Sequence, residues 1–221
     1  MAALGAARGG DDLTSTRPRL VVGISGSSAP QYGIALLEAL RKLGTVETHL
    51  VVSAGARRTV ELEARRDPDE VCALADVVHD SRDLAAAVSS GSFLTLGMAV
   101  VPCSMKTLAA VAHGFSGDLL ARAADVTLKE RRRLVLVTRE TPLGLVHLRN
   151  MTAVTEAGAV VLPPVPGFYA RPRTIDDLIA HTVGKVLDQF GIEHHLFRRW
   201  DGPPDDAPDA PAARTPEEET L

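Results

Sequence analysis

The sequence predicts an α/β protein built on a single doubly wound, parallel, flavodoxin-like sheet in a three-layer arrangement. Short apolar, β-branched runs alternate along the chain with longer segments of helical periodicity, which is the pattern of repeated β–α units. Several of these runs lead directly into loops rich in Gly, Ser or Pro, and such loops mark the ends of strands. A hydrophobic content of 45% with 4% aromatic residues indicates a core rich in Ala, Val and Leu.

Length and charge divide the 221 residues into three regions. We expect a disordered arm at 1–16, one folded domain at 17–202, and a disordered Pro/Asp/Glu-rich tail at 203–221. The net charge of −4 belongs to the ends, because residues 201–221 hold seven acids and one base while residues 17–200 carry a net +3. A mildly positive body suits an anionic small molecule, whereas a nucleic-acid-binding protein needs a concentrated basic face.

Neither a membrane segment nor a secretory signal is predicted. No apolar run approaches the ~20 residues that span a bilayer, and the N-terminus lacks a basic start and a sustained apolar core. Cys72 and Cys103 make neither a disulfide framework nor a metal-binding set. We therefore expect a cytoplasmic protein without a metal.

The first β–α unit is expected to consist of a strand at 19–24, a turn at 25–31 and a helix at 32–43. A strand that leads through a Gly/Ser loop into a helix can bind an anion, because free backbone N–H groups and the helix dipole favour phosphate. The spacing alone is equally consistent with an ordinary β–α turn.

The next units follow the same pattern. A second strand at 46–52 ends at Ser53, and a helix at 54–65 carries Glu63. Residues 68–88 look helical and irregular.

A third strand at 96–101 is followed by a turn at 102–107, in which Ser104 is the expected N-cap of a helix. Two hydroxyl-rich helix starts on one edge of the sheet favour a phosphate-bearing ligand. Cys103 is interpreted as a small buried residue and not as a nucleophile, since no His lies beside it in the sequence.

A charged segment at 122–140 follows further helical sequence in 108–125. It contains six basic and three acidic residues around a short strand at 134–138. Arg139 and Glu140 therefore come just past the carboxyl end of that strand, where open α/β sheets bind their ligands.

The last part of the domain combines a helix at 143–158, a strand at 159–162 and a stiff loop at 163–172 that presents Phe168 and Tyr169.

Thr174 and Asp177 have the spacing of a capping box, which predicts a final helix at 175–190. This helix carries Lys185.

A series of short motifs resembles, in the same order, the motifs of the flavin prenyltransferase (UbiX) family. These are Gly23-Ile-Ser-Gly26, Ser90-Gly-Ser92, Gly97-Met98, Pro102-Cys-Ser104, Lys106-Thr107, Arg122-Ala-Ala-Asp125, Leu128-Lys-Glu-Arg131, Arg139-Glu-Thr-Pro142, His147-Leu148, Asn150-Met151, Leu162-Pro163-Pro164, Phe168-Tyr169 and Asp176-Asp177. The resemblance covers about residues 17–202. It implies an enzyme that attaches the dimethylallyl group of dimethylallyl phosphate to reduced FMN without a metal. It also implies a homododecamer whose product, prenylated FMN, is used by a partner decarboxylase.

The resemblance also implies roles for particular residues. FMN would be held on one side by Gly26, Ser27, Ser28 and Ser53, and on the other by Ser104, Met105, Lys106 and Thr107, with Arg139 touching both the flavin and the phosphate. The phosphate would be held by Lys129, Arg139, Tyr169 and Lys185, with Arg122 and Glu140 nearby. Glu63 would move a proton, with the retained phosphate as the alternative base, and Lys129 would reach the site of a neighbouring subunit.

Three departures from the family pattern concern ligand binding, and one of them is Ser116-Gly-Asp118 in place of the usual Asn-rich version. The loop Gly26-Ser-Ser-Ala-Pro30 replaces the family's Gly-Ala-Ser-Gly-Ala, so Ala29 replaces a glycine and Pro30 has no N–H to offer a phosphate. Lys185 stands where the family often has Arg, which exchanges a bidentate fork for a point charge.

Two other functions remain open at this point. An FMN-dependent cysteine decarboxylase of the phosphopantothenoylcysteine type would use an active-site His and a Pro-x-Met-Asn pattern, but residues 149–151 lack that Pro. A non-catalytic flavin carrier or decarboxylase subunit would not need Glu63, Lys129 and Lys185 together.

Overall fold

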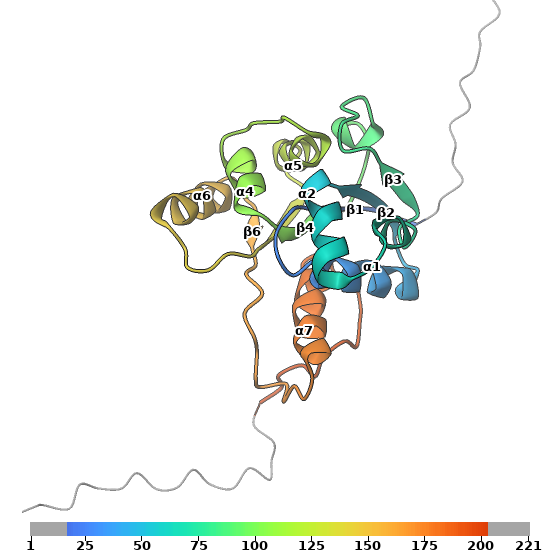
Figure 1. Ribbon diagram of the computed structural model, residues 1–221, viewed down its shortest axis with the longest axis vertical. Coiled ribbons are helices and arrows are strands. Elements are labelled where there is room, and N and C mark those ends of the chain that lie inside the picture. The colour runs from blue at the N-terminus through green and yellow to red at the C-terminus, as the bar shows by residue number, and fades with distance from the viewer. Residues whose placement is uncertain (1–16, 203–221) are drawn as a thin grey trace, which may run out of the picture.

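The computed structural model describes residues 17–202, so the arm predicted at 1–16 and the tail predicted at 203–221 lie outside the described residues. Its centre is a six-stranded parallel sheet in the order β3-β2-β1-β4-β5-β6, with helices on both faces (Figure 1). The strands are β1 (Arg19–Ile24), β2 (Glu47–Val52), β3 (Val77–His79), β4 (Gly97–Cys103), β5 (Arg133–Thr138) and β6 (Val160–Val161). The helices are α1 (Gln31–Leu43), α2 (Ala54–Thr59), α3 (Pro68–Cys72), α4 (Met105–Ala112), α5 (Leu119–Lys129), α6 (Leu145–Glu156) and α7 (Ile175–Asp188), with a π turn at Val60–Ala64 and a 3-10 turn at Ala87–Ser89.

Each face of the sheet has its own hydrophobic core, because successive side chains of a strand point to opposite faces. In β1, Leu20 and Val22 pack with α1 and α7, while Val21 packs in the second core with α4 and α5. Both cores contain large side chains that are fully buried, such as Leu36 in the first and Leu134 in the second. The apolar runs of the central strands are continuous because both faces are covered.

The order of the strands places a switch point between β1 and β4. From β1 the chain proceeds outward through β2 to β3, and from β4 it proceeds outward in the other direction through β5 to β6. The loops that leave β1 and β4 therefore diverge to opposite faces of the sheet. The space between two such loops, at the carboxyl ends of the strands, is the usual ligand site of open α/β sheets.

One part of the secondary-structure prediction was wrong. Residues 68–88, expected to be helical and irregular, contain α3 and then the edge strand β3. Three residues with Val78 exposed leave too little apolar pattern for a strand to be recognised from sequence. Without β3 the order of the sheet is β2-β1-β4-β5-β6, which is the flavodoxin-like order that was predicted.

No helix within residues 17–202 is both long enough and apolar enough to cross a membrane.

Candidate active site

Ser25 joins the two strands at the switch point. Its side chain is buried, its Oγ donates a hydrogen bond to the carbonyl of Pro102 (3.0 Å), and the same Oγ accepts one from the backbone N–H of Ser104 (2.7 Å). The end of β1 is thus fixed to the start of α4. Ser25 was not among the predicted site residues; its signal was its place directly after a buried strand and within a Gly-rich motif.

Two serines cap the helices that start at this edge. Ser104 accepts a hydrogen bond from the backbone N–H of Thr107 (3.3 Å) and donates one to the Thr107 hydroxyl (3.2 Å), which confirms the predicted N-cap of α4. Ser53 caps α2 in the same way, accepting from the N–H of Ala56 (3.1 Å). Both hydroxyls lie directly after the carboxyl end of a strand, Ser53 after β2 and Ser104 after β4.

Met105 and Lys106, the other two residues predicted to hold the flavin from the side of α4, differ in exposure. Met105 is partly buried and packs on the core below α4, whereas Lys106 is exposed. The ammonium group of Lys106 is therefore free to meet an anion at the helix start.

The loop after β1 runs close to two other elements. A Cβ on Gly26 would lie 2.9 Å from the Cα of Gly55, so the two backbones touch in a way that no other residue at position 26 allows. Ser27 Oγ donates to the carbonyl of Arg139 at 3.0 Å. The loop of β1 is therefore attached to the end of β5, which brings Ser27 next to the backbone of Arg139.

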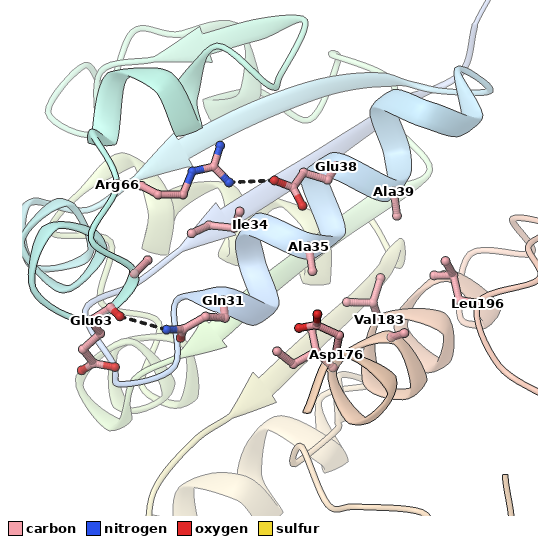
Figure 2. Close-up of a pocket in the computed structure, with 13 residues that line it drawn as sticks. Gln31, Ile34, Ala35, Glu38, Ala39, Glu63, Arg66, Asp176, Val183 and Leu196 are labelled. Atoms are coloured by element: carbon pink, nitrogen blue, oxygen red, sulfur yellow. Dashed lines mark hydrogen bonds and ion pairs between the residues drawn. The ribbon is translucent and has the colours of Figure 1, made fainter. Parts of the chain in front are cut away.

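Glu63 is bound to the same loop. Its Oε2 accepts hydrogen bonds from Ser28 Oγ (2.9 Å) and from the backbone N–H of Ala29 (2.8 Å). Its carbonyl accepts from Gln31 Nε2 at 3.2 Å (Figure 2). Ala29 has a φ of +67°, a strained conformation for a residue with a Cβ. The N–H of Ala29 is thus already bonded to Glu63, and Pro30 has no N–H. The start of α1 therefore has fewer free N–H donors for an anion than the family's glycine loop.

A groove of about 410 Å³ continues from Glu63 between α1 and α7. Figure 2 shows Ala35 of α1 facing Val183 of α7 across it, and Ile34 of α1 also lines the groove. The ion pair between Arg66 and Glu38 (2.7 Å) borders the groove on the α1 side. Glu63 therefore lies between the loop after β1 and a groove whose walls are partly apolar and partly charged.

Arg139 and Glu140 follow the carboxyl end of β5, as predicted. The N–H of Arg139 donates to the carbonyl of Cys103 (3.2 Å), and the Glu140 carboxylate accepts from the N–H of Thr141 (3.0 Å). These residues line a cavity of about 220 Å³ together with residues 163–165. Its wall includes Thr138. Among the described residues, the Thr138 hydroxyl is buried and has no hydrogen-bond partner.

Tyr169 and Lys185 lie on the α7 side. The Tyr169 hydroxyl is hydrogen-bonded to Nε2 of His181 (2.9 Å), one turn of α7 before Lys185. The pKa of His181 is lowered mainly by burial of the imidazole and, to a smaller extent, by the positive charge of Lys185. Lys185 Nζ lies 3.7 Å from Asp188, so part of its charge is already compensated.

Arg122 and Lys129 do not join this group within one chain. Both belong to α5, where Arg122 pairs with Asp125 (2.8 Å) and Lys129 with Glu130. Lys129 precedes the amino end of β5 and Arg139 follows its carboxyl end. A six-residue strand is about 20 Å long, so Lys129 of one chain is remote from its own Arg139.

Two further predictions concern nucleophiles and metals. Cys103 is fully buried, and this burial raises the pKa of its thiol to about 12, so the interpretation as a packing residue is confirmed. Within the described part of the chain, no group of three or more His, Cys, Asp or Glu residues could hold a metal ion.

Comparison with known proteins assigns this arrangement to a family. The Flavoprotein family model matches residues 11–187. The flavin prenyltransferase UbiX of Escherichia coli K12 is 58% identical over 186 residues, which is 83% of this chain and 98% of that protein. The chain belongs to the flavin prenyltransferase family.

Solved structures of this family have the same fold. AnUbiX (PadA1), crystallised with FMN and dimethylallyl pyrophosphate, has a TM-score of 0.82 at 56% identity and covers 84% of this chain and 98% of its own. A dodecameric FMN-dependent UbiX-like decarboxylase from Escherichia coli O157:H7 has a TM-score of 0.81 at 53% identity, covering 83% and 100%. By contrast, the FMN-dependent cysteine decarboxylase SpaF is 20% identical with a TM-score of 0.55 over 66% of this chain and 83% of its own, which shows a shared fold and no more.

For a flavin prenyltransferase, the separation of Arg139 from Lys129 is informative. At the carboxyl edge, hydrogen bonds join Ser25 to Ser104, Ser27 to Arg139 and Ser28 to Glu63. The cations on α5 lie along residues 89–91: Arg122 Nε donates to the carbonyl of Ser89 at 3.2 Å, and Lys129 Nζ lies next to Gly91. The predicted site residues thus fall into two groups that one chain keeps apart.

Proposed function

We propose that this flavin prenyltransferase transfers the dimethylallyl group of dimethylallyl phosphate to reduced FMN, and that its product, prenylated FMN, serves a partner decarboxylase. The observation that carries the proposal is the junction of Gly26, Ser27 and Arg139 with the capped starts of α2 and α4 at one switch point. AnUbiX, a relative with 56% identity, was crystallised with FMN and the diphosphate form of the same prenyl donor.

The flavin fits between the two capped helices. Gly26, Ser27, Ser28 and Ser53 hold FMN from the side of β1 and β2, and Ser104, Met105, Lys106 and Thr107 hold it from the side of β4. The close contact of Gly26 with Gly55 holds the loop after β1 against the start of α2, so both segments border the flavin. Reduced FMN supplies the electron-rich ring that accepts the prenyl group.

The phosphate of the prenyl donor is bound by cationic side chains and by the hydroxyl of Tyr169. Arg139, Tyr169 and Lys185 bind the phosphate, together with Lys129 of a neighbouring subunit. As the carbon–oxygen bond of the donor breaks, negative charge grows on the phosphate and positive charge on the allyl group. Oriented cations and hydrogen bonds stabilise the departing phosphate.

Acidic residues accompany these cations. Glu63, held by the loop that faces the flavin, is positioned to move a proton during the reaction, with the retained phosphate as the alternative base. Arg122 and Glu140 lie near the same phosphate, Glu140 as the residue directly after Arg139 and Arg122 from the second group.

The active unit is an oligomer, which we propose to be a homododecamer with its sites between subunits. Two observations support it: Lys129 lies at the opposite end of β5 from Arg139, and a relative with 53% identity is dodecameric. We place the catalytic body at residues 17–202. We also place the protein in the cytoplasm, where its two free cysteines remain reduced.

The deciding experiment is an anaerobic incubation of the protein with reduced FMN and dimethylallyl phosphate, followed by mass spectrometry of the flavin. We expect a flavin heavier by one C5 unit, formed equally well in EDTA. Dimethylallyl diphosphate in a parallel incubation determines which donor is preferred. An unchanged flavin, or turnover that EDTA abolishes and Mg²⁺ restores, contradicts the proposal.

The same samples distinguish the two alternatives. A cysteine decarboxylase would release CO₂ from a peptide or pantothenoyl cysteine substrate with oxidised FMN and leave the flavin mass unchanged. A carrier would bind FMN without forming any product.

A further inference from the structure

We propose that this protein has a second anion site, separate from the prenyl donor, that binds a phosphate or diphosphate group. The site is a cavity of about 320 Å³ between the loop after β6, the first half of α7 and residues 195–198. We call it the basic cavity, after the five basic residues that line it: Arg171, Arg173, His181, His195 and Arg198. Figure 1 shows the loop after β6 and the C-terminal segment both passing the N-terminal end of α7, where these residues meet.

The charge of the basic cavity is unbalanced. The one acid in its wall is Asp177, and its Oδ2 accepts hydrogen bonds from the backbone N–H groups of Arg173 (2.8 Å) and Thr174 (2.9 Å). These two bonds lower the pKa of Asp177, and the bond from Arg173 has the larger effect. The negative charge of Asp177 therefore stabilises the N-terminal cap of α7. Among the described residues the carboxylate forms no ion pair with an arginine side chain, although the charge of Arg173 also helps to lower its pKa.

The arginine side chains of the basic cavity are available for a ligand. Within residues 17–202, the side chains of Arg171, Arg173 and Arg198 make no hydrogen bond and no ion pair. Arg199, the next residue in the chain, differs, because it is fixed to Asp188 at 2.7 Å. A guanidinium group offers a planar fork that matches phosphate oxygens. Three such groups around one small cavity therefore favour an anion with several oxygens and more than one charge.

The basic cavity is adjacent to the proposed active site but does not include the groups that hold the donor phosphate there. Arg139 and Lys185 are absent from its wall. The connection is His181, which lines the cavity and is hydrogen-bonded to the Tyr169 hydroxyl at 2.9 Å. An anion in the cavity therefore lies one side chain away from Tyr169.

Isothermal titration calorimetry of the full-length, FMN-free protein with inorganic diphosphate, at constant ionic strength, tests the proposal. The cavity variant is Arg171→Gln/Arg198→Gln, which removes both positive charges and keeps a polar side chain at each position. The matched control is Lys42→Gln/Arg149→Gln, which removes the same charge from two exposed positions outside the cavity. Each protein is also titrated with Arg139→Ala added, so that binding at the donor site is weakened separately.

We expect the cavity variant to weaken diphosphate binding about tenfold or more, with and without Arg139→Ala. The control should change the dissociation constant less than about twofold. Equal weakening by the control means that net charge and not a site is responsible, and loss of all binding on Arg139→Ala alone means that the donor site accounts for it; either result overturns the proposal. Far-UV circular dichroism confirms that the variants are folded.

Separate titrations with inorganic phosphate and with dimethylallyl phosphate identify the source of the anion. Weaker binding of inorganic phosphate by the cavity variant indicates a site for the released product. Weaker binding of dimethylallyl phosphate, with Arg139→Ala present, indicates a site where the donor waits before it reacts. If neither ligand nor diphosphate distinguishes the cavity variant from the control, the inference is wrong. Because none of these titrations requires turnover, failure of the proposed transferase activity leaves the test intact.

Discussion

At the scale of single residues, Ser25 has the clearest predicted effect. Ser25→Ala removes the hydroxyl that joins Pro102 to Ser104 and leaves both backbone groups without their partner. We expect a loss of about 1–3 kcal/mol in stability, together with weaker FMN binding, because the start of α4 is no longer fixed to β1.

Fluorescence titration with FMN and chemical unfolding measure the two effects separately. Thr152→Ala, which removes an exposed hydroxyl from α6, is the control and should leave FMN affinity unchanged. If Ser25→Ala is destabilised but binds FMN normally, Ser25 is structural and does not position the flavin site.

Tyr169→Phe tests the assignment of the aromatic loop to the prenyl donor. A hydrogen bond to a charged phosphate contributes about 1.5–3 kcal/mol, so we expect kcat/KM for dimethylallyl phosphate to fall roughly tenfold to a hundredfold while FMN affinity is retained. Steady-state assays at saturating reduced FMN and a separate FMN titration give the two numbers.

The opposite result, loss of FMN binding with normal use of the donor, assigns Tyr169 to the flavin instead. His181→Gln is the companion variant. It removes the imidazole that contacts the Tyr169 hydroxyl and leaves the phenol itself in place.

At the scale of elements, the loop after β1 depends on a glycine. Gly26→Ala places a Cβ 2.9 Å from the backbone of Gly55, so the loop after β1 and the start of α2 have to separate. We expect FMN affinity to fall at least about tenfold, since both segments lie in the flavin site. Gly144→Ala is the control, because its Cβ would meet no atom closer than 3.8 Å. Equal FMN affinity in the two variants contradicts the placement of the flavin at this loop.

Elements set by local sequence were predictable. The capping residues Ser104 and Thr174 act on N–H groups three residues away, so the starts of α4 and α7 could be read directly from the chain. The strand β3 could not, because a three-residue edge strand is held by its neighbour β2 and not by its own pattern.

The site was predictable in part, and the limit is again distance along the chain. Arg139 and Glu140 follow a recognisable strand, so their edge of the sheet was known. The role of Ser25 depends on partners 77 and 79 residues away, which no local pattern reveals. Lys129 entered the prediction through family resemblance alone, since a lysine at the exposed end of a helix is ordinarily a solvated residue.

At the scale of the whole molecule, the proposed sites between subunits predict complementation. Lys129→Ala and Arg139→Ala should each be nearly inactive. Oligomers assembled from both variants together should recover about a quarter of wild-type activity, because by chance one site in four receives both intact residues. The measurement is prenyl transfer after co-expression, with each variant purified alone as the control. Mixed oligomers as inactive as either variant would place both residues in the site of one chain.

The position of Lys129 and Arg139 at opposite ends of β5 also has a kinetic consequence. If each chain holds half of two different sites, a folded but isolated subunit has none that is complete. Turnover then follows the law of mass action: specific activity should fall when the protein is diluted below the dissociation constant of its subunits, and it should return on concentration. An ordinary one-chain enzyme keeps the same specific activity at every dilution. The amount of protein in the cell would therefore set not only how many sites exist but also what fraction of the chains takes part in catalysis.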